Sequence, residues 1–143
     1  MLTKEFINPH PMGFTNTVTY THGGVKTILV SGQVGYADGK VGETFEEQVD
    51  IAHQNVIREL ESAGATAADL IKINTYVVDL DSTRSKAVQA AKAKYLTQPN
   101  QPASTMVGVS ALVMKPLLVE IEATAVMEAV SYTHLRAHET VAN

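Results

Sequence analysis

Two glutamates lie two positions apart in an apolar segment of the sequence. Glu120 and Glu122 are the only acids between Gln101 and Ala123. If the segment forms a strand, the alternation of side chains places both carboxylates on one face. A partly buried carboxylate can orient a water molecule for attack or exchange a proton with a leaving group. It can equally be a structural acid hydrogen-bonded across a subunit contact. Both interpretations stay open for Glu120, and we predict a structural or exposed role for Glu122.

No other group of residues has the spacing of a known catalytic, metal or phosphate site. The sequence has no cysteine, which excludes disulfides and thiol chemistry. His10, His22 and His53 lack metal-ligand spacing, so we expect no metal site and predict surface positions for all three. The glycines do not form a GxGxxG or GxxxxGK phosphate loop.

The charges of the sequence argue against a nucleic-acid partner. The net charge is −4, and basic residues cluster no further than the alternating pair Lys92 and Lys94, which we interpret as a solvated helix face. No apolar run approaches membrane-spanning length, and the first residues do not resemble a secretion signal. We therefore expect a cytoplasmic protein without a membrane partner.

Alternating apolar and polar residues predict the strands that must position the two glutamates. Strands are expected at residues 17–21, 26–32, 71–78, 103–111 and 117–127. In the last of these, the odd-numbered positions are apolar and suit a face covered by helices. The face with Glu120 and Glu122 also carries apolar residues, which is typical of a contact between subunits.

Two segments have the three- and four-residue spacing of a helix with one buried face. The first has its apolar positions at Phe45, Val49, Ala52, Val56, Leu60 and Ala63. Thr44 and Glu47 fit a capping box at its start, and Gly64 fits a stop. The second runs over residues 82–96 with Ser82 as its cap. The order ββαβαββ contains five strands and predicts an α+β fold with two helices on one face of a mixed sheet, which we expect to be six-stranded.

Several motifs together resemble one known family. SGQVG at residues 31–35, the helix segment 48–55, INTYVVDL at 73–80 and PAST…VGV…LVEIEA resemble the reactive intermediate deaminase (Rid, RidA/YjgF-like) family over residues 9–127. The resemblance implies a chorismate-mutase-like fold and a homotrimer with pockets between subunits. It also implies hydrolysis of 2-imino or 2-enamino acids to 2-keto acids and ammonia, without metal or cofactor. Some members were first described as ribonucleases or translation inhibitors.

Three positions depart from the family pattern. Ser104 follows Pro102-Ala103 where archetypal members have a carboxylate-binding arginine, so a bidentate, charge-assisted contact is missing. Thr15 occupies the position of a substrate-lining tyrosine of the family, and Met106 occupies a position where archetypal members often have a cysteine. We therefore expect a substrate other than the archetypal 2-imino acids.

Three further residues match pocket positions of the family. Glu120 corresponds to its pocket glutamate, Ser31 lies at a pocket-lining position, and Gln89 takes the place of a pocket asparagine. Ser31 is alternatively a plain turn residue and Gln89 a solvated helix residue.

The leading hypothesis is a divergent Rid-like hydrolase that acts on a small reactive imine or enamine, with Glu120 positioning water. The alternative is a non-catalytic trimer that binds a small metabolite in the same cleft, and ribonuclease activity ranks third. One domain is expected over residues 1–129. Residues 130–143 lose all periodicity, and their back-translation resembles a sequencing adapter, so we predict a non-native or disordered tail and exclude it from the fold.

Overall fold

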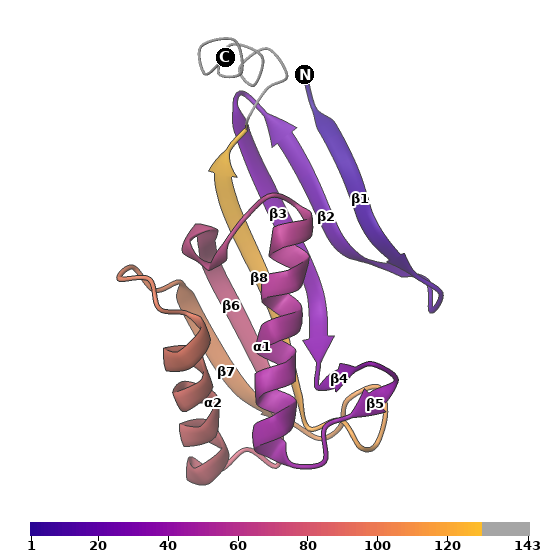
Figure 1. The fold of residues 1–143 in the computed structure, drawn as a ribbon, viewed down its shortest axis with the longest axis vertical. Helices are drawn as coiled ribbons and strands as arrows, with labels where there is room; N and C mark the ends of the chain where they lie inside the picture. Colours follow the sequence, from indigo (N-terminus) through magenta and orange to yellow (C-terminus); the bar gives the residue numbers. More distant parts are fainter. Residues whose placement is uncertain (130–143) are drawn as a thin grey trace.

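The computed structural model describes residues 1–129, so the predicted tail lies outside the described residues. Six strands form one sheet in the order β1-β2-β3-β8-β6-β7, and two helices cover one of its faces (Figure 1). All neighbours are antiparallel except β6 and β7, which are parallel. The sheet is therefore mixed, and the predicted α+β fold is confirmed.

The strands follow the predicted ranges closely where a predicted range exists. Their bounds are β1 (Thr3–His10), β2 (Phe14–His22), β3 (Val25–Val34), β6 (Leu70–Val78), β7 (Ala103–Val109) and β8 (Val119–Glu128), and a short hairpin comprises β4 (Tyr36–Ala37) and β5 (Lys40–Val41). The last strand in sequence, β8, lies in the middle of the sheet between β3 and β6.

Strand β1 is the sixth strand, and its range did not follow from the residue pattern. Seven of its eight residues are exposed, so it has no buried face to impose an apolar alternation on the sequence. Backbone pairing with β2 holds it in place. The Asn8 side chain joins it to the helical layer, because Asn8 Nδ2 donates to Glu59 Oε1 at 3.1 Å and to Ser62 Oγ at 3.3 Å.

Helix α1 (Phe45–Ser62) buries the face that its spacing predicts and ends before Gly64, at φ 85°. The capping box is only half present. Thr44 accepts from the Glu47 amide at 3.1 Å, whereas the Glu47 carboxylate accepts from the amide of Glu43. The buried Gln48 then ties α1 to two loops through three hydrogen bonds, given to the carbonyls of Gly42 and Pro116 and received from the amide of Leu118.

Helix α2 (Ser82–Tyr95) begins one residue earlier than a Ser82 cap requires. The N-cap is Asp81, whose carboxylate accepts from the amide of Arg84 at 2.8 Å. Both residue types are good caps. The extended backbone at Asp81 selects it and leaves Ser82 inside the first turn.

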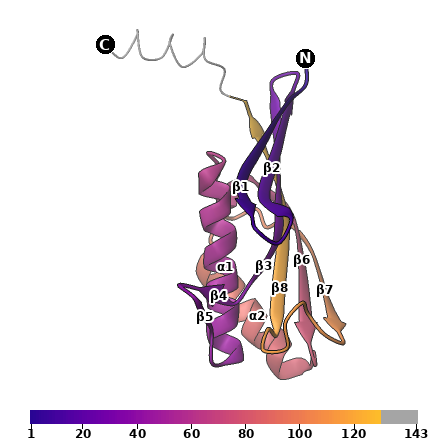
Figure 2. The ribbon, with the colours of Figure 1, turned by 90° about the vertical axis from the view of Figure 1, so that its right-hand side faces the viewer.

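The core lies between the helices and one face of the sheet. In β8 the buried residues are Val119, Ile121, Ala123 and Ala125, which confirms the predicted helix-covered face. Viewed along the sheet, both helices lie on one side, and the opposite face is uncovered in the protomer (Figure 2). Among residues 1–129, no helix has the length and hydropathy needed to cross a membrane.

Candidate functional site

Glu120 lies on the uncovered face of the sheet, where its side chain is half-buried. It pairs with Val34 in β3 and Tyr76 in β6. Its carboxylate lies directly over Gly32, since a Cβ on Gly32 would be only 2.2 Å from Glu120 Oε2. Burial raises the pKa of Glu120, and the nearby Glu122 carboxylate raises this pKa further. No hydrogen bond to the Glu120 carboxylate is present within residues 1–129, so this acid is available to a ligand or to water.

Glu122 lies on the same face of the sheet as Glu120, but its carboxylate has a different environment. It is half-buried, and its Oε1 accepts from Asn74 Nδ2 at 3.0 Å and from the Tyr76 hydroxyl at 2.5 Å. The bond to Glu122 raises the pKa of Tyr76, with desolvation as the second cause. These contacts hold Glu122 in the sheet, as expected of a structural acid. The two glutamates therefore differ in their freedom to bind a ligand.

Thr15 of β2 lies beside Ser31 of β3, which directly precedes Gly32 in that strand. The Ser31 hydroxyl donates to the backbone carbonyl of Thr15 at 2.6 Å, and both residues are half-buried. The pairing of β3 with β8 is irregular between Val30 and Gln33, which marks a bulge at Ser31 and Gly32. The bulge therefore includes Gly32, the residue that the Glu120 carboxylate overlies.

Ser104, Met106 and Gln89 belong to the other end of the sheet. Ser104 and Met106 lie on the edge strand β7, opposite Ile73 and Thr75 of the helix-covered face. Met106 packs against the core, and Ser104 Oγ accepts from Lys92 Nζ of α2 at 2.6 Å. Gln89 is exposed on α2 and donates to Ser85 of its own helix.

One protomer therefore does not bring the six predicted residues into one site. Glu120 and Ser104 lie on opposite faces of the sheet, and strand β6 separates β8 from β7. Two strand spacings amount to about 10 Å. The two groups can meet only if the β7 edge of one copy lies near Gly32 and Glu120 of another.

A cavity of about 210 Å³ opens on the uncovered face beside Glu122. Its lining includes Leu29, Lys72, Asn74, Glu122 and Thr124. Glu120 is not part of it. Among residues 1–129, no group of three or more histidine, aspartate and glutamate side chains is arranged to hold a metal ion.

Two predictions about single residues were wrong. His53 is only 2% exposed, and Lys92 is half-buried. A signal for both was present in the spacing, because His53 is four residues after Val49 and Lys92 four residues after Val88, which are both buried. We predicted exposure for these two residues because their side chains are polar. Their spacing along the helices places them on the inner side instead.

Comparisons with known proteins give a consistent assignment. The family model described as Endoribonuclease L-PSP matches residues 14–127. A RutC family protein of Haemophilus influenzae is 38% identical over 104 residues, which cover 69% of this chain and 78% of that protein.

Solved structures have the same fold. RidA from the Antarctic bacterium Psychrobacter sp. PAMC 21119 is 26% identical, with a TM-score of 0.71, over 83% of this chain and 93% of that one. A YjgF/YER057c/UK114 family member from Mycobacterium tuberculosis is 27% identical, also with a TM-score of 0.71, over 87% of this chain and all of the other.

Proposed function

The chain belongs to the Endoribonuclease L-PSP family, which includes the Rid proteins, and from this membership we propose that it hydrolyses a small imine or enamine. The observation that carries the proposal is the Glu120 carboxylate. It is half-buried and free of hydrogen bonds within residues 1–129, and burial raises its pKa. A raised pKa makes the carboxylate easier to protonate, so that it can take a proton and return it during a reaction.

The proposed reaction needs one water molecule and one carboxylate. Ionised Glu120 accepts a proton from the water as its oxygen attacks the carbon of the C=N bond. The protonated Glu120 then returns this proton to the nitrogen, which gives a carbinolamine. Glu120 next accepts the proton of the new hydroxyl group and delivers it to the nitrogen, so that the C–N bond breaks as the C=O bond forms, and a carbonyl compound and ammonia leave. The raised pKa helps Glu120 to accept a proton, because it favours the protonated form of the acid.

The site is proposed to form between copies in a homotrimer. The uncovered sheet face contains exposed apolar side chains, among them Tyr20 and Leu29, which are 41% and 43% exposed. An uncovered face of this kind favours association. Light scattering should then give about 46 kDa, three times the chain mass of 15.4 kDa. A concentration-independent monomer would contradict both the trimer and the shared site.

The test of the activity compares wild type with Glu120→Gln. An imine is generated in situ by an amino-acid oxidase, and its rate of disappearance is measured with and without the protein. We expect Glu120→Gln to lower kcat/KM about 100-fold or more, since it removes general acid–base catalysis. Glu122→Gln is the matched control and should retain most activity. Metabolite binding without turnover in wild type would instead favour the non-catalytic alternative, and RNA cleavage in the same preparation would favour a nuclease.

A further inference from the structure

The edge formed by α2 and β7 carries a cation that the proposed reaction does not yet use. Lys92 extends from the last turn of α2 to the edge strand, where its ammonium donates to Ser104 Oγ at 2.6 Å. Within residues 1–129, no carboxylate lies within 4.0 Å of this ammonium. The neighbouring Lys94 differs, because it is 3.9 Å from Asp50 and its side chain is 63% exposed.

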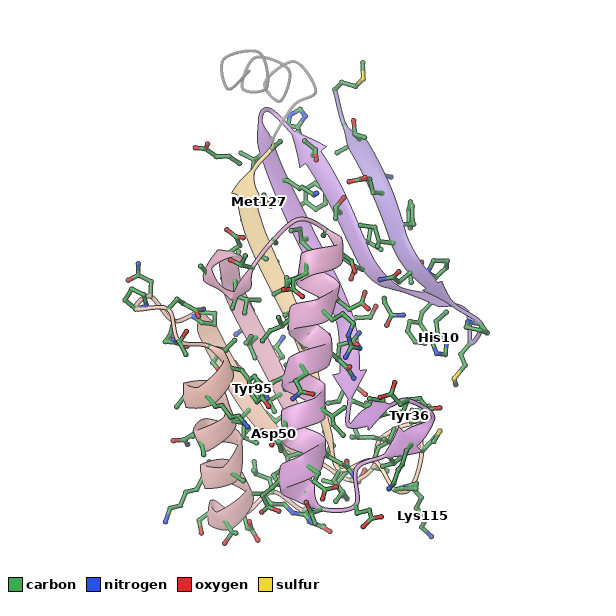
Figure 3. All side chains as sticks on the ribbon, viewed as in Figure 1. His10, Tyr36, Asp50, Tyr95, Lys115 and Met127 are labelled. Carbon is green, nitrogen blue, oxygen red and sulfur yellow. The ribbon has the colours of Figure 1, made fainter. Side chains whose placement is uncertain are left out.

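Asp50, a carboxylate in the surroundings of Lys92, pairs with Lys94 and not with Lys92. His53 of α1 is buried, its Nδ1 is 2.8 Å from the Val49 carbonyl, and its ring stacks on Tyr95 at 5.7 Å between centroids. Asp50 and Tyr95 mark this region between the two helices (Figure 3). Because the Val49 carbonyl can only accept a hydrogen bond, the Nδ1 of His53 carries the proton. Burial lowers the pKa of His53, which favours the neutral ring. Burial also lowers the pKa of Lys92.

Partial burial of an ammonium without a counter-ion is unfavourable unless an anion arrives. An ammonium has three donors, and Ser104 takes only one of them. Ser104 itself is exposed on an edge strand, and its hydroxyl proton is free to donate because its oxygen accepts from Lys92. The pair can thus offer N–H and O–H donors to the same small anion.

We propose that Lys92 and Ser104 form the binding site for the carboxylate group of a small substrate. This proposal rests on the proposed function, in which the α2–β7 edge of one copy faces Glu120 of another. Lys92 then holds the carboxylate while Glu120 of the neighbouring copy positions the water. Because Ser104 carries no positive charge, the sequence suggested a substrate other than a 2-imino acid. In the structure, the ammonium of Lys92 on α2 supplies a positive charge next to Ser104.

The test uses pyruvate and its uncharged amide, pyruvamide, which share their size and differ in charge. Binding is followed by NMR titration of the full chain, with Lys92→Met as the variant and Lys94→Met as the matched control. Thermal unfolding is recorded for every variant. We expect wild type to bind pyruvate with a millimolar Kd, and Lys92→Met to weaken pyruvate binding about 10- to 100-fold while leaving pyruvamide unchanged. Lys94→Met should bind like wild type.

Three results would overturn the site. These are the absence of pyruvate binding to wild type, equal binding by wild type and a folded Lys92→Met, or an equal loss in Lys94→Met. Because binding is measured without turnover, a failure of the proposed hydrolysis would appear separately. It would appear as pyruvate binding that depends on Lys92, together with an imine that disappears no faster with protein than without it.

Discussion

Replacement of Gly32 by alanine tests whether the position of the Glu120 carboxylate matters. The added Cβ would lie 2.2 Å from Oε2, 2.6 Å from Cδ and 2.8 Å from Cγ of Glu120. Unbonded carbon atoms prefer separations of about 3.5–4.0 Å, so the carboxylate must move by about 1 Å. The backbone at Gly32 is not in the left-handed region, and alanine adds no backbone strain there.

The cost in stability should be small and the cost in activity large. Glu120 can swing aside by rotation of its own side chain, at about 1 kcal/mol of unfolding free energy. A displacement of about 1 Å in a catalytic group can lower the rate about 100-fold. We therefore expect Gly32→Ala to fold normally, with a kcat/KM for imine hydrolysis close to that of Glu120→Gln.

The matched control is Gly35→Ala, in which the new Cβ would meet a helix and not a flexible side chain. It would lie 2.4 Å from Cβ and 2.6 Å from the backbone Cα of Gln48. Helix α1 must then shift, and overpacking of this kind costs about 2–3 kcal/mol. Both variants are compared by urea unfolding and by the imine assay. Wild-type activity in Gly32→Ala would refute the role given to the placement of Glu120, and a loss of more than about 2 kcal/mol in Gly32→Ala would refute the free movement of its side chain.

Three other predictions concern stability and titration. Burial raises the pKa of Glu120 in the folded state, so ionisation of this acid costs stability as pH rises from its ordinary pKa of 4.5 through the folded pKa. Glu120→Gln should therefore be more stable than wild type at pH 7, and urea unfolding should show this difference vanishing below about pH 4. Gln48→Ala removes three hydrogen bonds between α1 and two loops and should lower the unfolding free energy by about 2–4 kcal/mol, whereas an effect below about 1 kcal/mol would contradict that role. Glu122→Gln should lower the pKa of Tyr76, measured by phenolate absorbance against Tyr76→Phe, and an unchanged titration would contradict the hydrogen bond as its cause.

The sequence predicted the elements whose side chains have a buried face. Val49, Val56 and Leu60 follow the helix period and are buried, and the alternation of β8 separates Ile121 from Glu120 as expected. Strand β1 was missed because its residues are exposed on both faces, so its position depends on backbone pairing, which leaves no mark on composition.

The candidate site was only partly predictable, because its parts come from different levels of structure. Glu120 and Glu122 share a face by alternation alone, but their different hydrogen bonding depends on Asn74 and Tyr76 of β6, nearly fifty residues away in sequence. The contact of Lys92 with Ser104 likewise depends on how α2 packs over β7. Which copies of the chain meet at Ser104 and Glu120 is a property of the assembly and stays a prediction.

The central place of β8 has a consequence for biosynthesis. Strands β1–β3 and the pair β6–β7 are joined only through β8, so a nascent chain that has emerged as far as Val109 holds two separate fragments of a sheet. Val30 in β3 pairs with Ala123, and Ile73 in β6 pairs with the same residue from the other side. Contacts over such long sequence separations form slowly. Until β8 leaves the ribosome, the facing edges of β3 and β6 remain open to other chains, which makes this period of synthesis the one in which chaperones would be most needed.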